Sequence, residues 1–206
     1  MLEALGLECV RGHRRLFRGL TFHLAAGQML WVLGPNGSGK TTLLRLLCGL
    51  LRPEGGNVRW KGEDVRGSPD SLHADLLYLG HAPAVKDDLS SRENLCFGLA
   101  QTGIGVTPRE ADAVLSEFGL AGREMVPTRA LSQGQKRRAA LSRLSLGTAK
   151  ALWVLDEPFA ALDAQAVQLV QAHLGRQLTR GGCVVFTSHH EVELAGHAVT
   201  RLQLAQ

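Results

Sequence analysis

The first eighty residues consist mostly of strand-length apolar runs. These runs are bounded by turn residues and lie at 2–10, 16–24, 29–33, 57–61 and 75–80. Apolar runs of this length predict β-strands. The run at 75–80 is almost wholly apolar, which is typical of a strand in the interior of a sheet.

One segment in this region has helical periodicity instead. It follows the strand expected at 29–33, and its leucines fall on one predicted helix face: Leu43, Leu44, Leu46, Leu47 and Leu50. We expect this helix to end at 49–52, before the turn-forming sequence Pro-Glu-Gly-Gly at 53–56. A buried strand and an amphipathic helix therefore frame residues 34–42.

The pattern from residue 81 to about residue 149 is helical and contains three helix starts. Each start is a capping box, in which a hydroxyl residue is followed three positions later by Glu or Gln. The three pairs are Ser90 with Glu93, Thr107 with Glu110, and Ser132 with Gln135. The helices are expected to end at Gly103, Gly119 and Gly147. This stretch predicts a helical subdomain, at about 81–149, inserted into an α/β core formed by about 1–80 and 150–206.

The last part of the chain returns to strands. Apolar runs at 151–155, 183–186 and 199–204 predict three of them. Between the first two, a helix is expected to open at Asp163 and to close at 181–182. The chain of 206 residues is thus expected to form a single domain, long enough for a substantial core.

Composition narrows the class of protein. The chain is 45% hydrophobic, yet no apolar run approaches the ~18 residues of a membrane-spanning helix. The N-terminus does not have the pattern of a signal peptide, so we expect a soluble chain and assign any membrane-embedded part to another chain. The cysteines are far apart, which predicts buried thiols rather than disulfides or a zinc site: Cys9, Cys48, Cys96 and Cys183.

Charge adds one candidate surface. The formal net charge is +4, and basic residues cluster at Arg11, His13, Arg14, Arg15 and Arg18. Such a cluster could face nucleic acid or anionic lipid. A solvated hairpin edge is the favoured interpretation, because the interleaved aromatic side chains of nucleic-acid-binding surfaces are missing. No nucleic-acid partner is expected.

Residues 34–41 match the phosphate-binding loop G-x-x-x-x-G-K-[ST], and the framing strand and helix are the context that the motif requires. The loop and the residue after it are Gly34, Pro35, Asn36, Gly37, Ser38, Gly39, Lys40, Thr41 and Thr42. Its backbone N–H groups and the helix N-terminus would hold phosphates. Lys40 would bind the β- and γ-phosphates, and the Thr41 hydroxyl would bind Mg²⁺. The motif predicts a nucleotide site.

A pair of carboxylates directly follows the strand expected at 151–155. Because ligands bind beyond the carboxyl ends of strands in open α/β sheets, Asp156 and Glu157 should lie beside the phosphate loop. Asp156 would hold Mg²⁺, and Glu157 would orient and deprotonate the attacking water as a general base. A solvent-facing acidic pair is the alternative, and the upstream phosphate loop makes it the weaker one.

The sequence Leu-Ser-Gln-Gly-Gln at 131–135 lies shortly before that strand. It resembles the L-S-G-G-Q signature of the ATP-binding cassette (ABC) ATPases, with Gln133 in place of a glycine. The resemblance extends over essentially the whole chain. It implies a phosphate-loop NTPase fold with a mainly parallel core sheet, an N-terminal antiparallel β subdomain and an inserted helical subdomain. It also implies that Ser132, Gly134 and Gln135 contact the γ-phosphate held by the phosphate loop of a second copy.

The resemblance assigns four further residues. Asp163, in the sequence Ala-Ala-Leu-Asp at 160–163, matches the D-loop that crosses the dimer interface. His189 matches the switch histidine, which steadies the attacking water. His81 stands where the family has a glutamine near the metal, which implies a contact with Mg²⁺ or its water. Arg11 lies near the place of the adenine-stacking aromatic, and its guanidinium plane could stack instead.

Segments 78–83, 93–95 and 152–159 look like those of one ABC subtype, the ATP-binding subunit of the haem exporter of cytochrome c maturation. This resemblance implies a homodimer that binds ATP and Mg²⁺ and associates with integral membrane subunits at the cytoplasmic face of the bacterial inner membrane. ATP hydrolysis would energise haem export, through release of a haem-loaded chaperone, without direct contact between this chain and haem.

Three alternatives stay open. The chain could serve another small-molecule ABC exporter, or it could be a soluble ABC ATPase acting on nucleic acid. The soluble class usually carries two fused cassettes or a long coiled coil, and this sequence has neither. A phosphate-loop kinase is a third alternative. Glu157, Ser132 and His189 argue against it, because a kinase needs an acceptor site and lid arginines.

Overall fold

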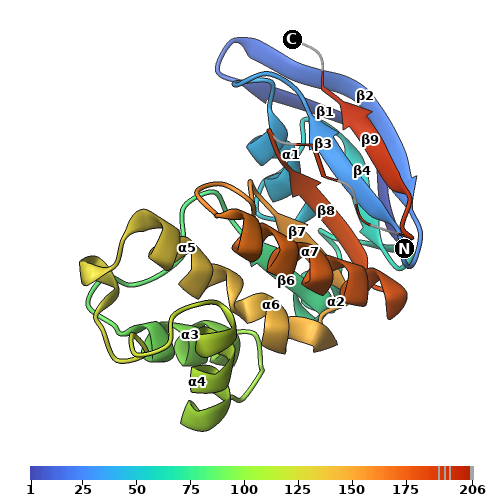
Figure 1. Ribbon diagram of the computed structural model, residues 1–206. Helices are drawn as coiled ribbons and strands as arrows, with labels where there is room; N and C mark the ends of the chain where they lie inside the picture. The colour runs from blue at the N-terminus through green and yellow to red at the C-terminus, as the bar shows by residue number, and fades with distance from the viewer. Residues whose placement is uncertain (190, 193, 195, 205–206) are drawn as a thin grey trace.

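The strands of this protein form two sheets (Figure 1). The computed structural model describes residues 1–189, 191–192, 194 and 196–204. One sheet is antiparallel, with the order β2 (Arg14–Leu24), β1 (Leu2–Arg11), β4 (Gly55–Trp60), β5 (Glu63–Asp64). The other is parallel, with the order β6 (Leu76–Leu79), β7 (Leu152–Leu155), β8 (Cys183–Thr187), β3 (Met29–Leu33), β9 (Val199–Gln203).

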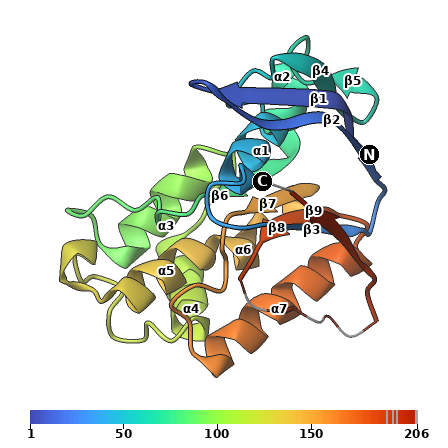
Figure 2. The same cartoon turned by 90° about the horizontal axis from the view of Figure 1, so that it is seen from above.

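Seven α-helices in the described part of the chain surround these sheets. They are α1 (Lys40–Leu47), α2 (Pro69–Asp75), α3 (Ser91–Ala100), α4 (Pro108–Glu117), α5 (Gln133–Leu141), α6 (Arg143–Leu146) and α7 (Ala164–Thr179). Short 3₁₀ turns lie at Thr128–Ala130 and Gly147–Ala149. Seen from above, α1 lies between the two sheets and α7 covers the opposite face of the parallel sheet, while α3 to α6 gather to one side (Figure 2).

Burial on both faces of the parallel sheet explains its strand sequences. In β7, Trp153 and Leu155 point into the core that contains the α7 residue Leu174. The alternate residues Leu152 and Val154 point into the second core, which lies between the parallel sheet, α1 and the antiparallel sheet. Because successive side chains of a strand point to opposite faces, a strand buried on both faces must be apolar throughout. The predicted α/β fold class is confirmed.

The observed helix starts agree with those predicted from the sequence, but the interior of one predicted helix does not. All three predicted capping boxes are present, at the N-termini of α3, α4 and α5. The single helix expected from Ser132 to Gly147 is wrong, since it divides at Ser142 into α5 and α6. The Ser142 hydroxyl donates to the Ala139 carbonyl at 2.7 Å, and such a local bond competes with the regular helical pattern.

Two other predictions are wrong, and two elements were not predicted. The run at 75–80 was expected to be an interior strand, but β6 pairs only with β7 and is an edge strand of the described sheet. Its apolar sequence reflects burial on both faces. Leu50 was expected on the buried face of α1, but it follows the helix and is 54% exposed. The short strand β5 and the helix α2 had no recognised signal.

The parallel sheet determines where a ligand site can form. The loops that follow β3, β6, β7 and β8 all leave the sheet at its carboxyl edge. These loops carry residues 34–39, 80–81, 156–157 and 188–189. Open α/β sheets bind ligands at this edge. Candidate residues far apart in sequence are thereby brought together.

Candidate functional site

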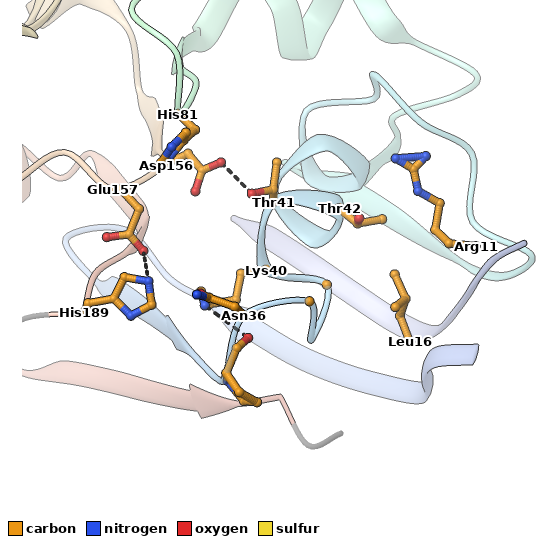
Figure 3. Close-up of a pocket in the computed structure, with 13 residues that line it drawn as sticks. Arg11, Leu16, Asn36, Lys40, Thr41, Thr42, His81, Asp156, Glu157 and His189 are labelled. Carbon is orange, nitrogen blue, oxygen red and sulfur yellow. Dashed lines mark hydrogen bonds and ion pairs between the residues drawn. The ribbon is translucent and has the colours of Figure 1, made fainter. Parts of the chain in front are cut away.

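A cavity of about 510 Å³ lies at the carboxyl edge of the parallel sheet (Figure 3). The phosphate loop and the loops after β6, β7 and β8 contribute to its wall. The lining residues are Arg11, Leu16, Pro35, Asn36, Gly37, Gly39, Lys40, Thr41, Thr42, His81, Asp156, Glu157 and His189. Most of the residues singled out in the sequence therefore share one wall.

The phosphate loop takes a shape that only glycine permits at two points. Gly34 has φ +150°, and a Cβ there would lie 2.5 Å from Ser38 Oγ and 2.8 Å from the Leu204 carbonyl oxygen. Gly39 has φ +99° and forms the N-cap of α1. The first-turn N–H groups of α1 therefore face the loop, which is the arrangement that binds phosphate. Lys40 Nζ donates to the Gly34 carbonyl at 2.7 Å and lies within the same loop.

Asp156 joins three elements at the floor of the cavity. It is 2% exposed, and it accepts hydrogen bonds from two hydroxyls. The Thr41 hydroxyl donates to Asp156 Oδ2 at 2.7 Å, and the Thr187 hydroxyl donates to Asp156 Oδ1 at 2.8 Å. A buried carboxylate is stable only when its oxygens are satisfied in this way. These bonds fix α1, β7 and β8 relative to one another.

Glu157 has an unusual backbone conformation, and one of its carboxylate oxygens makes no hydrogen bond in the described structure. Its φ is +53°, a left-handed conformation that costs a non-glycine residue about 1–3 kcal/mol. The Thr187 hydroxyl accepts from the Glu157 N–H at 2.8 Å. Glu157 Oε1 is buried and has no hydrogen-bond partner in the described structure, and His189 Nε2 lies 3.5 Å from it. Figure 3 shows these two side chains next to each other at one end of the cavity. Glu157 lines the cavity, so its carboxylate can accept a proton from a molecule held there.

Arg11 and Leu16 lie on the other side of the phosphate loop from Glu157 and His189 (Figure 3). They come from β1 and β2 of the antiparallel sheet. The cavity thus has a carboxylate end, beside β7, and an arginine end, beside the antiparallel sheet. The two ends suit the γ-phosphate and the base of a nucleotide.

The residues of the signature sequence do not line this cavity. Ser132, Gly134, Gln135 and Asp163 are absent from its described wall. They lie together on a separate surface, because a Cβ at Gly134 would come within 3.1 Å of the Ala161 carbonyl oxygen. Arg138 of α5 also pairs with Asp163. We call Ser132, Gly134, Gln135 and Asp163 the signature surface.

The donor set at the cavity floor fits magnesium bound together with phosphate. Thr41 and Asp156 supply a hydroxyl and a carboxylate, the oxygen ligands that Mg²⁺ prefers. Among the described residues, no group of three or more His, Cys, Asp and Glu is arranged to hold a metal ion. Mg²⁺ commonly takes one or two protein ligands and completes its shell with phosphate oxygens and water. His81 also lines the cavity, so a contact through water fits its position.

Sequence reasoning missed three residues around the site. Leu16 lines the arginine end, Thr187 holds both Asp156 and Glu157, and Arg137 donates to the carbonyls of Asp156 and Glu157. Thr187 carried a usable signal, because it is the first hydroxyl residue after a buried apolar run and its strand neighbours the Asp156 strand. Arg137 and Leu16 carried none, since one lies inside a helix and the other inside a hairpin.

Comparisons with known proteins agree with this fold. The family model described as "ABC transporter" matches residues 17–160. Similar structures include an ATP-binding protein of a putative ABC transporter from Pyrococcus furiosus, with a TM-score of 0.82 at 24% identity over 98% of this chain and 96% of that one. Another is an ATP-binding cassette solved as a dimer bound to ADP and Pi, with a TM-score of 0.78 at 20% identity over 92% of this chain and 88% of that one.

The chain belongs to the ABC transporter family, and its activity is that of an ABC-type ATPase, which hydrolyses ATP to ADP and phosphate. Its curated relatives include proteins named "Cytochrome c biogenesis ATP-binding export protein CcmA". The one from Nitrosospira multiformis is 49% identical over 98% of both chains. The one from Salmonella typhi is 50% identical over 99% of this chain and 97% of its own length.

The structure predicts that Thr187→Val impairs both folding and turnover. Valine keeps the shape of threonine but leaves Asp156 Oδ1 and the Glu157 N–H without their partner. Each unpaired buried group costs about 1–3 kcal/mol, so the free energy of unfolding in urea should fall by at least that amount. The rate of phosphate release per folded molecule should fall as well.

Thr187→Ser is the matched control, because it retains the hydroxyl. Its stability should stay within about 1 kcal/mol of wild type, since it loses only one methyl group. Equal stability and turnover in Thr187→Val and wild type would contradict the role given to this hydroxyl.

Proposed function

We propose that this chain is the ATP-hydrolysing subunit of a membrane export complex that acts in cytochrome c maturation and energises haem export. The observation that carries the proposal is the convergence of Lys40, Thr41, Asp156 and Glu157 on one cavity. Near full-length identity of 49–50% to relatives named as cytochrome c biogenesis export proteins supports the subtype. Release of a haem-loaded chaperone is the event that hydrolysis would drive.

The phosphate loop holds the triphosphate of ATP in this proposal. Backbone N–H groups of residues 34–39 and the N-terminus of α1 surround the phosphates, with Ser38 and Thr42 flanking the lysine. Lys40 turns from the Gly34 carbonyl to the β- and γ-phosphates, exchanging a neutral acceptor for a charged one. Arg11 and Leu16 provide a planar cation and an apolar side chain for the adenine.

Hydrolysis is assigned to the carboxylate end of the cavity. The Glu157 carboxylate takes a proton from a water, and the oxygen of that water attacks the γ-phosphorus while ADP leaves. His189, whose Nε2 lies 3.5 Å from Glu157 Oε1, orients the water and contacts the γ-phosphate. Thr41 and Asp156 would hold Mg²⁺, which would supply positive charge beside the phosphates.

The complete site forms between two copies of the chain. The signature surface lies outside the cavity, and the N-terminus of α5 is a second phosphate-binding position. Ser132 of each copy would therefore contact the γ-phosphate held by the other copy. Because ATP contacts both copies, its binding favours a closed dimer and its hydrolysis releases the dimer.

Integral membrane subunits complete the proposed assembly. No helix in the described part of this chain combines the length and apolar character needed to cross a membrane. The helical subdomain, at about 81–149, is the part assigned to contact the membrane subunits, and the core, at about 1–80 and 150–206, hydrolyses ATP. The chain would then act at the cytoplasmic face of the bacterial inner membrane without touching haem.

Glu157→Gln tests the catalytic assignment. The amide keeps the size of the side chain but has no basic oxygen, so phosphate release should fall by about 10²-fold or more while ATP still binds. The ATP-bound variant should run as a dimer in size-exclusion chromatography. Glu63→Gln, on the exposed strand β5, is the control and should hydrolyse ATP at the wild-type rate. Turnover near wild type in Glu157→Gln would remove Glu157 as the general base.

Rescue of a bacterium that lacks its own such ATPase tests the subtype. Expression of the wild-type chain should restore haem-stained c-type cytochromes, and Lys40→Ala should not, because the charged phosphate contact is lost. Normal phosphate release without any rescue would assign the ATPase to a different cargo.

A further inference from the structure

Arg137 is a buried arginine of α5 that contacts the loop after β7, where Asp156 and Glu157 lie. It lies in α5, five residues after Ser132, and is 4% exposed. Its guanidinium donates to four backbone carbonyls, with N···O distances of 3.1 Å to Gly80, 3.2 Å to His81, 2.8 Å to Asp156 and 2.5 Å to Glu157. These carbonyls belong to the loops after β6 and β7.

This arrangement needs an arginine. Four acceptors in two loops require several donors in a fixed plane, which the guanidinium provides. A lysine ammonium has three donors on a single atom and cannot reach both loops with the same geometry. Arg137 therefore fixes the loop that contains His81 relative to the loop that contains Glu157.

Glu157 is held from both sides of its strained backbone. The Thr187 hydroxyl accepts from its N–H, and Arg137 donates to its carbonyl, while its φ stays at +53°. A left-handed non-glycine residue persists only where its surroundings fix it. Loss of the Arg137 bond would let the Glu157 peptide relax, and the carboxylate would move away from its position in the cavity.

Fold stability alone does not account for this arginine. Burial lowers the pKa of the Arg137 guanidinium, and the nearby charges of Asp156 and Glu157 act against that effect. Its Nε is also buried without a hydrogen-bond partner in the described structure. A well-packed apolar side chain is often no less stable than a buried charge. What the arginine provides is a fixed geometry of the loops after β6 and β7.

We propose that Arg137 is a positioning residue: from α5, the helix that Ser132 caps, it fixes the position of the Glu157 carboxylate in the cavity. Ser132, which the proposed function places against the second copy, is the N-cap of α5, and Arg137 on the same helix donates to the Glu157 carbonyl. Contact at Ser132 thereby affects the general base through a single rigid helix. The inference rests on the proposed function, in which Glu157 activates water and Ser132 contacts the partner's nucleotide.

Arg137→Lys and Arg137→Gln test the proposal in the full chain. In both, kcat for phosphate release should fall by on the order of 10-fold to 100-fold, as expected when a catalytic group is misplaced by about 1 Å. The KM for ATP should stay within about twofold of wild type. The phosphate loop keeps its contacts in both variants, so the binding of ATP in the ground state is unchanged. Rates are expressed per folded molecule, with the folded fraction taken from thermal melts.

Arg92→Lys is the matched control. Arg92 of α3 forms a two-bond ion pair with Asp112 of α4, at 2.6 Å for each bond, inside the helical region and away from the cavity. This variant loses a two-bond arginine contact outside the site and should keep the wild-type kcat. Equal loss of kcat in Arg92→Lys and Arg137→Lys would overturn the positioning role.

Coupling to Glu157 distinguishes positioning from a general structural effect. In a Glu157→Gln background, Arg137→Lys should cause little further loss of the residual turnover, because the group that it positions no longer acts as a base. A full additional loss in that background would overturn the proposal, as would an unchanged kcat in Arg137→Lys. Both outcomes leave the proposed function intact if the wild-type chain hydrolyses ATP, whereas a wild-type chain without ATPase activity would refute the proposed function itself.

Discussion

The buried carboxylate of Asp156 is the constraint on which the site depends. A charge that is 2% exposed must find partners inside the protein, and it finds them in the hydroxyls of Thr41 and Thr187. These partners belong to α1 and β8, so satisfying one carboxylate aligns the helix after the phosphate loop with two strands of the sheet. Thr187 then accepts from the N–H of Glu157. The backbone of Glu157, the residue proposed as general base, is therefore held by the same hydroxyl that satisfies Asp156.

The molecule separates phosphate binding from the signature surface. The cavity brings together the phosphate loop, Asp156, Glu157 and His189, while Ser132 and Asp163 lie outside it. Contacts within the chain keep the signature surface in order, through the approach of Gly134 to Ala161 and the pair between Arg138 and Asp163. In the proposed function, these two surfaces are half-sites, and a homodimer joins each one to its complement.

Much of the fold and the cavity could be predicted because their signals are local. Alternation, length and capping boxes identified most strands and helix starts, and the rule for carboxyl ends of strands brought the phosphate loop and Asp156 together. Contacts that depend on tertiary packing could not be predicted. The edge position of β6 is hidden because both of its faces are buried, and the break at Ser142 depends on one side-chain bond. Nothing in the sequence of α5 indicates that Arg137 lies beside four carbonyls.

Mixing two inactive variants tests the two-copy site most directly. Lys40→Ala removes the phosphate contact of one chain, and Ser132→Arg blocks the signature surface of the other. A mixed dimer would contain one site with both elements intact and one site with both altered. The account predicts little phosphate release from either variant alone and clear release from the mixture. A mixture no more active than the sum of its components, or full activity of Ser132→Arg by itself, would contradict it.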